Sequence, residues 1–436
     1  MLALRLARGG QPLVQLRRLL VAAASAGTGF LLLCTLGYAM GHPDASAGSV
    51  LRLAWCVAPV AATVYFAVAV ARTDPGTRPR PGLSAIGLGP GRLMAVSATT
   101  TALSTVLGSM LALLFFLHLR GDLTGMPFDG AAAQFLAADQ PLPLPAALTL
   151  LALVPLSASA ATALVLRPRG TQPGRAGRYG RAAARSGAVR SGRHAVGAQA
   201  APGTHEARTE QAESSTAAAE PAGGALDAPQ LFAPQAAPGG LPWGAAVLAA
   251  GLAVETYAGR SDSASGPALP GGFVVGPAGV LVGWALTAVG LALAGPAITY
   301  VCGRLLQAAR PGALRLLAGR VLQTEARRIG QPLGVVCAVA SGAYAMATLY
   351  AGVRPDFGPL TTLGALLVGG CTLLTLLTAA VEARQARADT TAALLRLGAP
   401  ATMLRSAAGL RVGALLAVFG PLTWVVAELA ALPLTR

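Results

Sequence analysis

Residues 381–411 read VEARQARADTTAALLRLGAPATMLRSAAGLR, and they separate two long apolar runs. When successive residues are placed 100° apart, one narrow apolar stripe results, which indicates an amphipathic helix. The stripe consists of Val381, Ala388, Ala392, Leu395 and Ala399. Its flanks are charged, with Arg384 and Arg387 on one side and Glu382, Asp389 and Arg396 on the other. Gly398 interrupts this pattern and Pro400 ends it. We therefore predict a helix along a membrane surface, a break at 397–399 and a return into the bilayer near Leu404.

The chain around this stretch has the composition of a membrane protein. Of its 436 residues, 54% are hydrophobic and 11% are charged, and the mean hydropathy is +0.60. A soluble domain carries about 25% charged residues. Because one span needs about 20 apolar residues, we expect an all-α polytopic integral membrane protein with about nine (8–10) transmembrane helices. The predicted spans are 19–41, 53–71, 93–118, 144–166, 242–258, 273–302, 332–352, 360–381 and 406–431.

The distribution of arginine predicts the orientation in the membrane. The run 19–41 follows a basic N-terminus but is longer than the apolar part of a signal peptide, so we expect a first span and not a cleaved signal. All 33 basic residues are Arg, and 28 of them lie in cytoplasmic segments if the N-terminus is cytoplasmic. Cytoplasmic loops carry such an excess. We therefore predict a multi-pass protein of the cell membrane with a cytoplasmic N-terminus and a cytoplasmic segment 382–405.

A central segment, 167–241, differs from the rest of the chain. It is rich in Ala, Gly, Pro and Ser, and its eight arginines between Arg167 and Arg193 are followed by mostly acidic residues. This composition predicts a disordered cytoplasmic linker between an N-terminal half, 1–166, and a C-terminal half, 242–436. The basic part of the linker either lies on anionic lipid headgroups or is a solvated spacer.

Several chemistries are disfavoured by the residues that the chain lacks or scatters. Without Lys there is neither a Walker A loop nor a Schiff-base lysine. The five cysteines lie in apolar runs without CxxC spacing, and the four histidines form no ligand set. No catalytic set is visible, so we expect a non-catalytic subunit with no cofactor and no metal site. Aromatic residues are only 5% and the arginines gather at helix ends, so we expect no nucleic-acid partner.

The two halves contain similar segments. A span ending at Arg72 is followed by a segment with the sequence Ile86-Gly87-Leu88-Gly89, and a span ending at Arg384 is followed by Leu395-Arg396-Leu397-Gly398. Each half thus has two spans, an Arg-led cytoplasmic segment, a Leu-Gly break and a further span, an internal repeat of the kind found in transporters. The first copy is broken by prolines, whereas residues 381–399 contain none. Only the second copy is expected to dock a partner as a helix.

This pattern resembles the FtsX-like permeases of ABC transporters, of the MacB and BceB type. The residues that carry the resemblance are Arg384, Arg387, Leu394, Leu395, Leu397, Gly398 and Ala399. A degenerate copy is formed by Arg72, Leu83, Ile86, Leu88 and Gly89. The resemblance covers roughly residues 15–120 and 320–430. It implies that this segment lies against a separate ATPase subunit and couples nucleotide-driven closure to the membrane helices. The sizeable extracytoplasmic domain usual in that family has no counterpart here, and nine spans leave the second half one helix short.

The resemblance therefore implies a permease subunit that couples ATP hydrolysis by another chain to export or extraction of a lipophilic or peptide substrate. Its partners would be a cytoplasmic ABC ATPase, membrane lipids, and a second copy or a partner permease. Two alternatives remain open, a secondary transporter and a non-transporting membrane regulator that acts through a partner. An ordinary positive-inside loop is the alternative reading of segment 382–405.

Three other features bear on these alternatives. Glu255 is the acid nearest to the interior of a span, and an interfacial carboxylate is favoured over a transport residue. The resemblance implies a basic amphipathic helix before the seventh span, at residues 315–328, with interfacial anchoring as the alternative. Small residues within the spans predict close helix packing. They include Gly283, Gly290, Gly295, Gly364, Gly369 and Gly370.

Overall fold

The computed structural model describes residues 12–74, 90–123, 130–167, 239–260, 268–269, 273–274, 278–308, 312–349, 358–398 and 400–431. Nine helices in these residues are long and apolar enough to cross a membrane, which confirms the predicted α-helical polytopic class. The predicted linker falls almost entirely outside the described residues, as do residues 75–89, which hold most of the first motif copy.

The elements follow one another as helices with a single short pair of strands. The N-terminal half contains α2 (Pro12–Gly41), α3 (Ser46–Trp55), α4 (Val57–Thr73), α6 (Pro90–Arg120) and α7 (Leu144–Leu166). The C-terminal half contains α10 (Leu241–Arg260), α11 (Ala278–Ala308), α12 (Ala313–Leu349), α13 (Pro359–Ala386), α14 (Ala388–Arg396) and α15 (Ala401–Ala431). Between α10 and α11, β1 (Ala268–Leu269) pairs antiparallel with β2 (Phe273–Val274). Helices α3 and α4 together form one span, Ser46–Thr73.

Some helices extend well beyond the predicted spans. Helix α12 has 37 residues, because the basic stretch 315–328 is helical, as predicted, and continues into the span without a break. Helix α2 begins at Pro12, a residue type that suits the first helical position since its missing N–H needs no partner there. Polar residues that flank an apolar run lower the mean hydropathy, but many of them are good helix formers. A prediction from hydropathy alone therefore gives helices that are too short.

In the N-terminal half, α2 packs against α4, α6 and α7. The apolar part of this contact includes the buried residues Leu33, Phe116 and Leu151. Small hydroxyl side chains join the helices as well, since Ser25 Oγ donates to the Thr105 carbonyl at 2.8 Å and Ser109 Oγ to the Leu151 carbonyl at 3.1 Å. Such interhelical hydrogen bonds and small residues are the usual means of helix association in a bilayer.

In the C-terminal half, α11 packs closely against α10 and α12, and α12 packs against α13 and α15. Glycines allow this approach: a Cβ on Gly290 would meet the backbone of Leu248, and a Cβ on Gly295 the backbone of Gly330. The predicted packing role is therefore confirmed for these glycines. For Gly369 and Gly370 it is wrong, because no described atom beyond their own helix neighbourhood lies within 4 Å of a Cβ built there.

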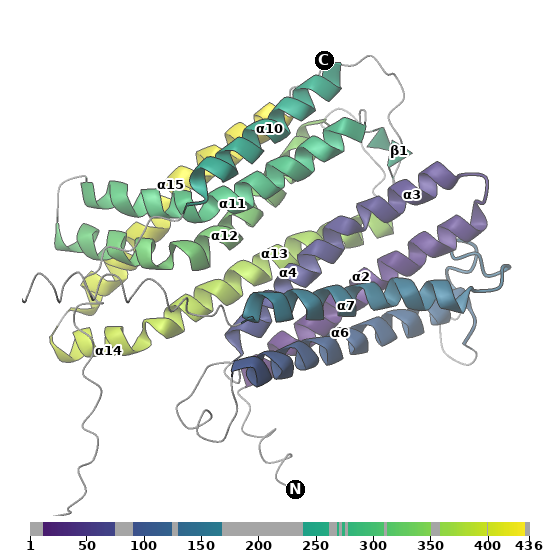
Figure 1. The fold of residues 1–436 in the computed structure, drawn as a ribbon, viewed down its shortest axis with the longest axis horizontal. Coiled ribbons are helices and arrows are strands. Elements are labelled where there is room, and N and C mark those ends of the chain that lie inside the picture. The colour runs from purple at the N-terminus through teal and green to yellow at the C-terminus, as the bar shows by residue number, and fades with distance from the viewer. Residues whose placement is uncertain are drawn as a thin grey trace, which may run out of the picture. The chain divides into compact units, whose positions relative to one another are not determined.

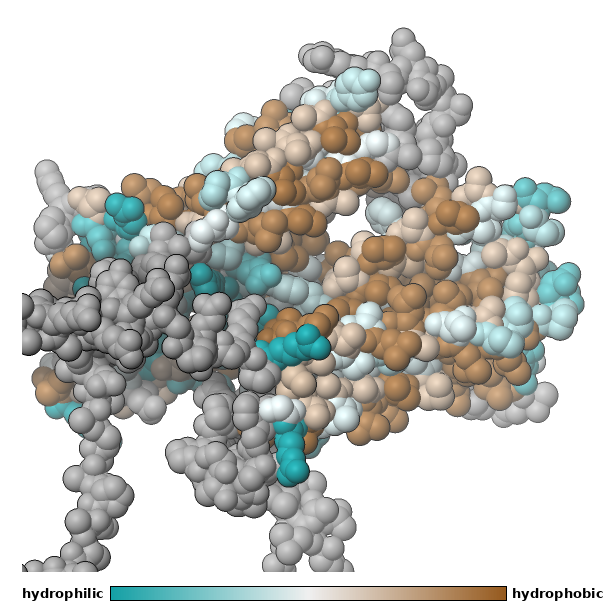
Figure 2. Space-filling view, viewed as in Figure 1, coloured by the Kyte–Doolittle hydropathy of each residue, from teal (hydrophilic) through white to brown (hydrophobic). Residues whose placement is uncertain are grey.

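Helices from the two halves meet where α4 packs along α13 (Figure 1). The contact contains the buried pair Thr63 Oγ1 and Cys371 Sγ, which are 4.0 Å apart, and Thr63 also lies 2.8 Å from Thr28 Oγ1 on α2. Figure 2 shows apolar residues along the middle of the helices and hydrophilic residues mainly toward their ends, as expected for a chain that lies in a bilayer.

Candidate functional site

The predicted coupling segment forms the junction of α13, α14 and α15. Arg384 is exposed near the end of α13, Leu394 and Leu395 lie in the nine-residue α14, and Leu397 and Gly398 form the turn that follows. Ala399, the last residue of the predicted motif, lies outside the described residues. The structure thus places the other six motif residues along one short stretch between two membrane-length helices.

One break in this stretch was predicted and another was not. Gly398 has a φ of +87°, a left-handed conformation that favours glycine, and it separates α14 from α15 as expected. The expectation of one continuous helix from residue 381 into this region is wrong, because α13 ends at Ala386 and α14 starts at Ala388. Val381 therefore belongs to a different helix from Leu395, and the predicted apolar stripe is divided between the two.

The unpredicted break coincides with a tertiary ion pair. Arg387 lies between α13 and α14 with φ −98° and ψ −4°. Its Nη1 atom is 3.1 Å from Glu325 Oε2 on α12, and the two side chains are 30% and 10% exposed. Because low exposure weakens solvent screening, this pair is stronger than an ordinary surface pair. It connects the start of α14 to α12, the helix that precedes α13.

Further charges at this end join the same helices. Arg328 on α12 lies 3.6 Å from Glu382 on α13, and both line a cavity of about 370 Å³ together with Arg72 at the end of α4. Arg72 is the residue that the internal repeat pairs with Arg384. The end of α4 is also joined to α2, since Arg18 forms a 2.5 Å ion pair with Asp74. Ion pairs at this end therefore join α2 to α4 in the N-terminal half and α12 to α13 in the C-terminal half.

The apolar side chains of α14 are left largely uncovered. Leu395 is 47% exposed and Leu397 is 83% exposed. Among the described elements, α14 packs only against the end of α13, with no more than marginal contact elsewhere. A short amphipathic helix with exposed leucines next to charged residues has the chemistry of a helix that docks into a groove of another protein.

Glu255 lies near the end of α10, and its side chain faces α11. Its side chain is fully buried on α10, and Thr287 Oγ1 on α11 donates a 3.0 Å hydrogen bond to its Oε1 atom. A sequence signal for this burial exists, because Gly251 precedes Glu255 by one helical turn and lies on the same face. A Cβ on Gly251 would meet Thr287, so that face is the one against which α11 packs.

The described residues offer no evident catalytic or metal centre. No group of three or more His, Cys, Asp or Glu side chains that could hold a metal ion occurs among them. The five cysteines are all buried as free thiols. Two places therefore remain as candidate functional sites, the junction of α13, α14 and α15 and the surroundings of Glu255.

Comparisons with protein-family models, with curated proteins and with solved structures find no match to this chain.

Proposed function

We propose that this chain is the permease subunit of an ABC transporter of the FtsX-like type, with α14 as the element that contacts a separate cytoplasmic ATPase. The transport cycle would move a lipophilic or peptide substrate out of the membrane or across it. The chain itself would supply no ATPase chemistry, since a Walker A loop needs the lysine that this sequence lacks.

The helix packing supports two pseudo-repeats within the proposed permease. Helix α2 packs against α4 and α6, and α12 packs against α13 and α15, the elements at corresponding positions of the predicted repeats. The corresponding helices α4 and α13 also pack against each other, as related halves do around a pseudo-twofold axis.

The observation that carries the proposal is the exposed α14 with Leu395 and Leu397 at its end. If α14 faces the cytoplasm, an ATPase that docks there would bury these leucines in its groove, where each buried leucine contributes about 1.5–3 kcal/mol. The position of α14 would allow it to transmit a movement of the ATPase to the membrane helices. It leads directly into α15, and Arg387 at its start is paired with Glu325 on α12. A displacement of α14 would therefore reach both helices that pack together in the second repeat.

The test is co-purification with the ATPase encoded next to this chain, provided that this neighbour has a Walker A loop. A double substitution, Leu395→Asp with Leu397→Asp, is expected to abolish association and the stimulation of ATP hydrolysis. The matched control is Leu314→Asp with Leu316→Asp, which changes two exposed leucines on α12 and should preserve association. Unchanged association of the α14 variant, or a neighbouring gene without an ATPase, would contradict the proposal.

A secondary transporter is the second candidate, and the burial of Glu255 favours it, since ionisable residues within spans often mark transport paths. The two candidates differ in their energy source. Transport by the chain in vesicles that lack any ATPase but carry an ion gradient would favour the secondary transporter, and transport that requires ATP and the second protein would favour the permease.

A further inference from the structure

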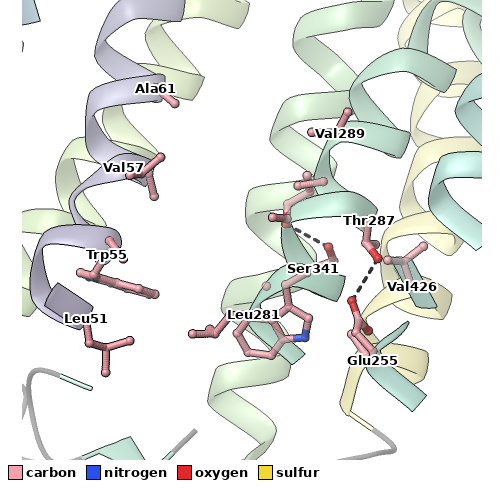
Figure 3. A pocket seen from close by; sticks show the side chains of 18 residues that line it. Leu51, Trp55, Val57, Ala61, Glu255, Leu281, Thr287, Val289, Ser341 and Val426 are labelled. Atoms are coloured by element: carbon pink, nitrogen blue, oxygen red, sulfur yellow. Dashed lines mark hydrogen bonds between the residues drawn. The ribbon is translucent and has the colours of Figure 1, made fainter. Parts of the chain in front are cut away.

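A cavity of about 570 Å³ lies between α3–α4 and the helices of the C-terminal half (Figure 3). One wall is formed by residues of α3 and α4, among them Trp55, Val57 and Ala61, and the opposite wall comes from α10, α11, α12 and α15. Its volume falls within the range of about 300–1,000 Å³ that is typical of small-molecule sites. Apolar side chains make up most of its lining, so the site suits a lipophilic ligand.

Glu255 is the only ionisable side chain among the described residues that line this cavity. It is completely buried, and its Oε2 atom has no hydrogen-bond partner among the described residues, whereas Oε1 accepts from Thr287. A buried carboxylate oxygen without a donor is costly, because it has lost its hydration without replacement. The arrangement therefore leaves one strong acceptor unpaired in the wall of the cavity.

The backbone of α10 and α11 fixes the carboxylate in this place. Gly251 and Gly283 lie at the closest approach of the two helices, and a Cβ on Gly283 would overlap the Glu255 side chain itself. Without those glycines the helices would separate and Glu255 would lose its contact with Thr287. The carboxylate is consequently held in the wall of the cavity and has little freedom to swing toward bulk water.

We propose that this cavity binds a lipophilic amine in its protonated form, with the ammonium group donating to Glu255 Oε2 and the apolar body filling the space beside α4. A charge-assisted hydrogen bond would satisfy the vacant acceptor and neutralise the only charge in the site. Trp284, which lies in the same wall as Glu255, adds an aromatic side chain of the kind that attracts a cation, and Trp55 in the opposite wall adds apolar area for the body of the ligand. An anion would be repelled by Glu255, and a neutral ligand would leave the carboxylate uncompensated.

The cavity is separate from the proposed ATPase contact. It is lined by α3, the first part of α4, the end of α10, the first half of α11, the second half of α12 and the end of α15, whereas Glu325 lies in the first half of α12 and Arg387 follows the end of α13. Neither Arg387 nor Glu325 lines the cavity. Binding of the amine needs no second protein, so it can be measured on the isolated chain. A negative result here would leave the ATPase proposal intact, and failure of that proposal would not affect this one.

The experiment is equilibrium dialysis of the full chain in lipid nanodiscs, with empty nanodiscs as background. The probes are biphenyl-4-ylmethanamine and two compounds of similar shape, biphenyl-4-ylmethanol and biphenyl-4-carboxylate. The amine is expected to bind about tenfold more tightly than the alcohol, the size of effect that one charge-assisted hydrogen bond gives, and the carboxylate should not bind. Glu255→Gln, which retains the acceptor for Thr287, should reduce amine binding to the level of the alcohol.

Two further variants keep the result interpretable. Glu428→Gln removes an acid from α15 that does not line the cavity and contacts Tyr344 instead, so it should leave the preference for the amine unchanged. Ala61→Phe fills the cavity from the exposed face of α4, away from Glu255, and should weaken the binding of amine and alcohol alike. Equal binding of amine and alcohol to the wild type would overturn the proposal. A preference for the amine that persists in Glu255→Gln, or that is lost in Glu428→Gln, would overturn it as well.

Discussion

The Glu325 carboxylate on α12 forms an ion pair with Arg387, the residue that precedes α14. Its Oε2 atom lies 3.1 Å from Arg387 Nη1, and the positive charges of Arg411 and Arg328 also act on it. The three arginines favour the charged form of this carboxylate, which its burial opposes. The pair coincides with the break at Arg387, a residue with no strong intrinsic tendency to end a helix.

Removal of either partner is expected to loosen the start of α14. Glu325→Gln or Arg387→Gln should accelerate hydrogen exchange of the α14 backbone amides about fivefold, which corresponds to about 1 kcal/mol for a partly buried ion pair. Hydrogen exchange followed by mass spectrometry measures this directly. The double variant should be no worse than either single variant, because both remove the same interaction. Arg18→Gln is the control, since its pair with Asp74 joins α2 to α4 and does not involve α14. Additive effects in the double variant would contradict the role given to the pair.

Among the elements, the number and class of the long helices could be predicted from the sequence, because apolar runs of sufficient length have few alternatives in a membrane. The break at Gly398 was also predictable, since only glycine adopts its positive φ without strain. The break at Arg387 was not, because neither glycine nor proline marks it, and the contact found there is with Glu325, a residue remote in sequence. The burial of Glu255 likewise depends on which helix packs against α10, and a hydropathy pattern carries no information about the packing partner.

The contact between α4 and α13 gives a prediction about the elements that join the two halves. Thr63 Oγ1 and Cys371 Sγ are 4.0 Å apart, so Thr63→Cys should form a disulfide with Cys371 under mild oxidation. The experiment needs the other four cysteines replaced by serine and a protease site inserted between residues 168 and 234. After cleavage, the two fragments should remain linked on a non-reducing gel and separate on reduction. Adding Cys371→Ser is the control and should abolish the link. Separation of the fragments without reductant would show that α4 and α13 are not neighbours.

For the whole molecule, the orientation in the membrane decides which end of the helices faces the cytoplasm and can contact an ATPase. The proposed ATPase contact requires α14 to be cytoplasmic, and the amine cavity at the opposite ends of the helices would then lie in the outer half of the bilayer. Of the 33 arginines, 28 fall in segments on the α14 side, an asymmetry that predicts this orientation strongly. The ATPase proposal therefore depends on the side of the membrane on which the arginine-rich segments lie, whereas binding of the amine does not.

The labelling of single introduced cysteines from one side of the membrane is expected to show this orientation. In a background in which the five buried native cysteines are replaced, Asp44→Cys and Thr390→Cys each introduce an exposed thiol, one before α3 and one on α14. A membrane-impermeant maleimide should label the Asp44→Cys variant in intact cells and the Thr390→Cys variant only after permeabilisation, because the two positions are predicted to lie on opposite sides. The cysteine-free parent controls for background labelling. The reverse pattern would place α14 outside the cell, where no ATP is available to drive an ATPase. In that case the exposed leucines of α14 would have to serve a different partner.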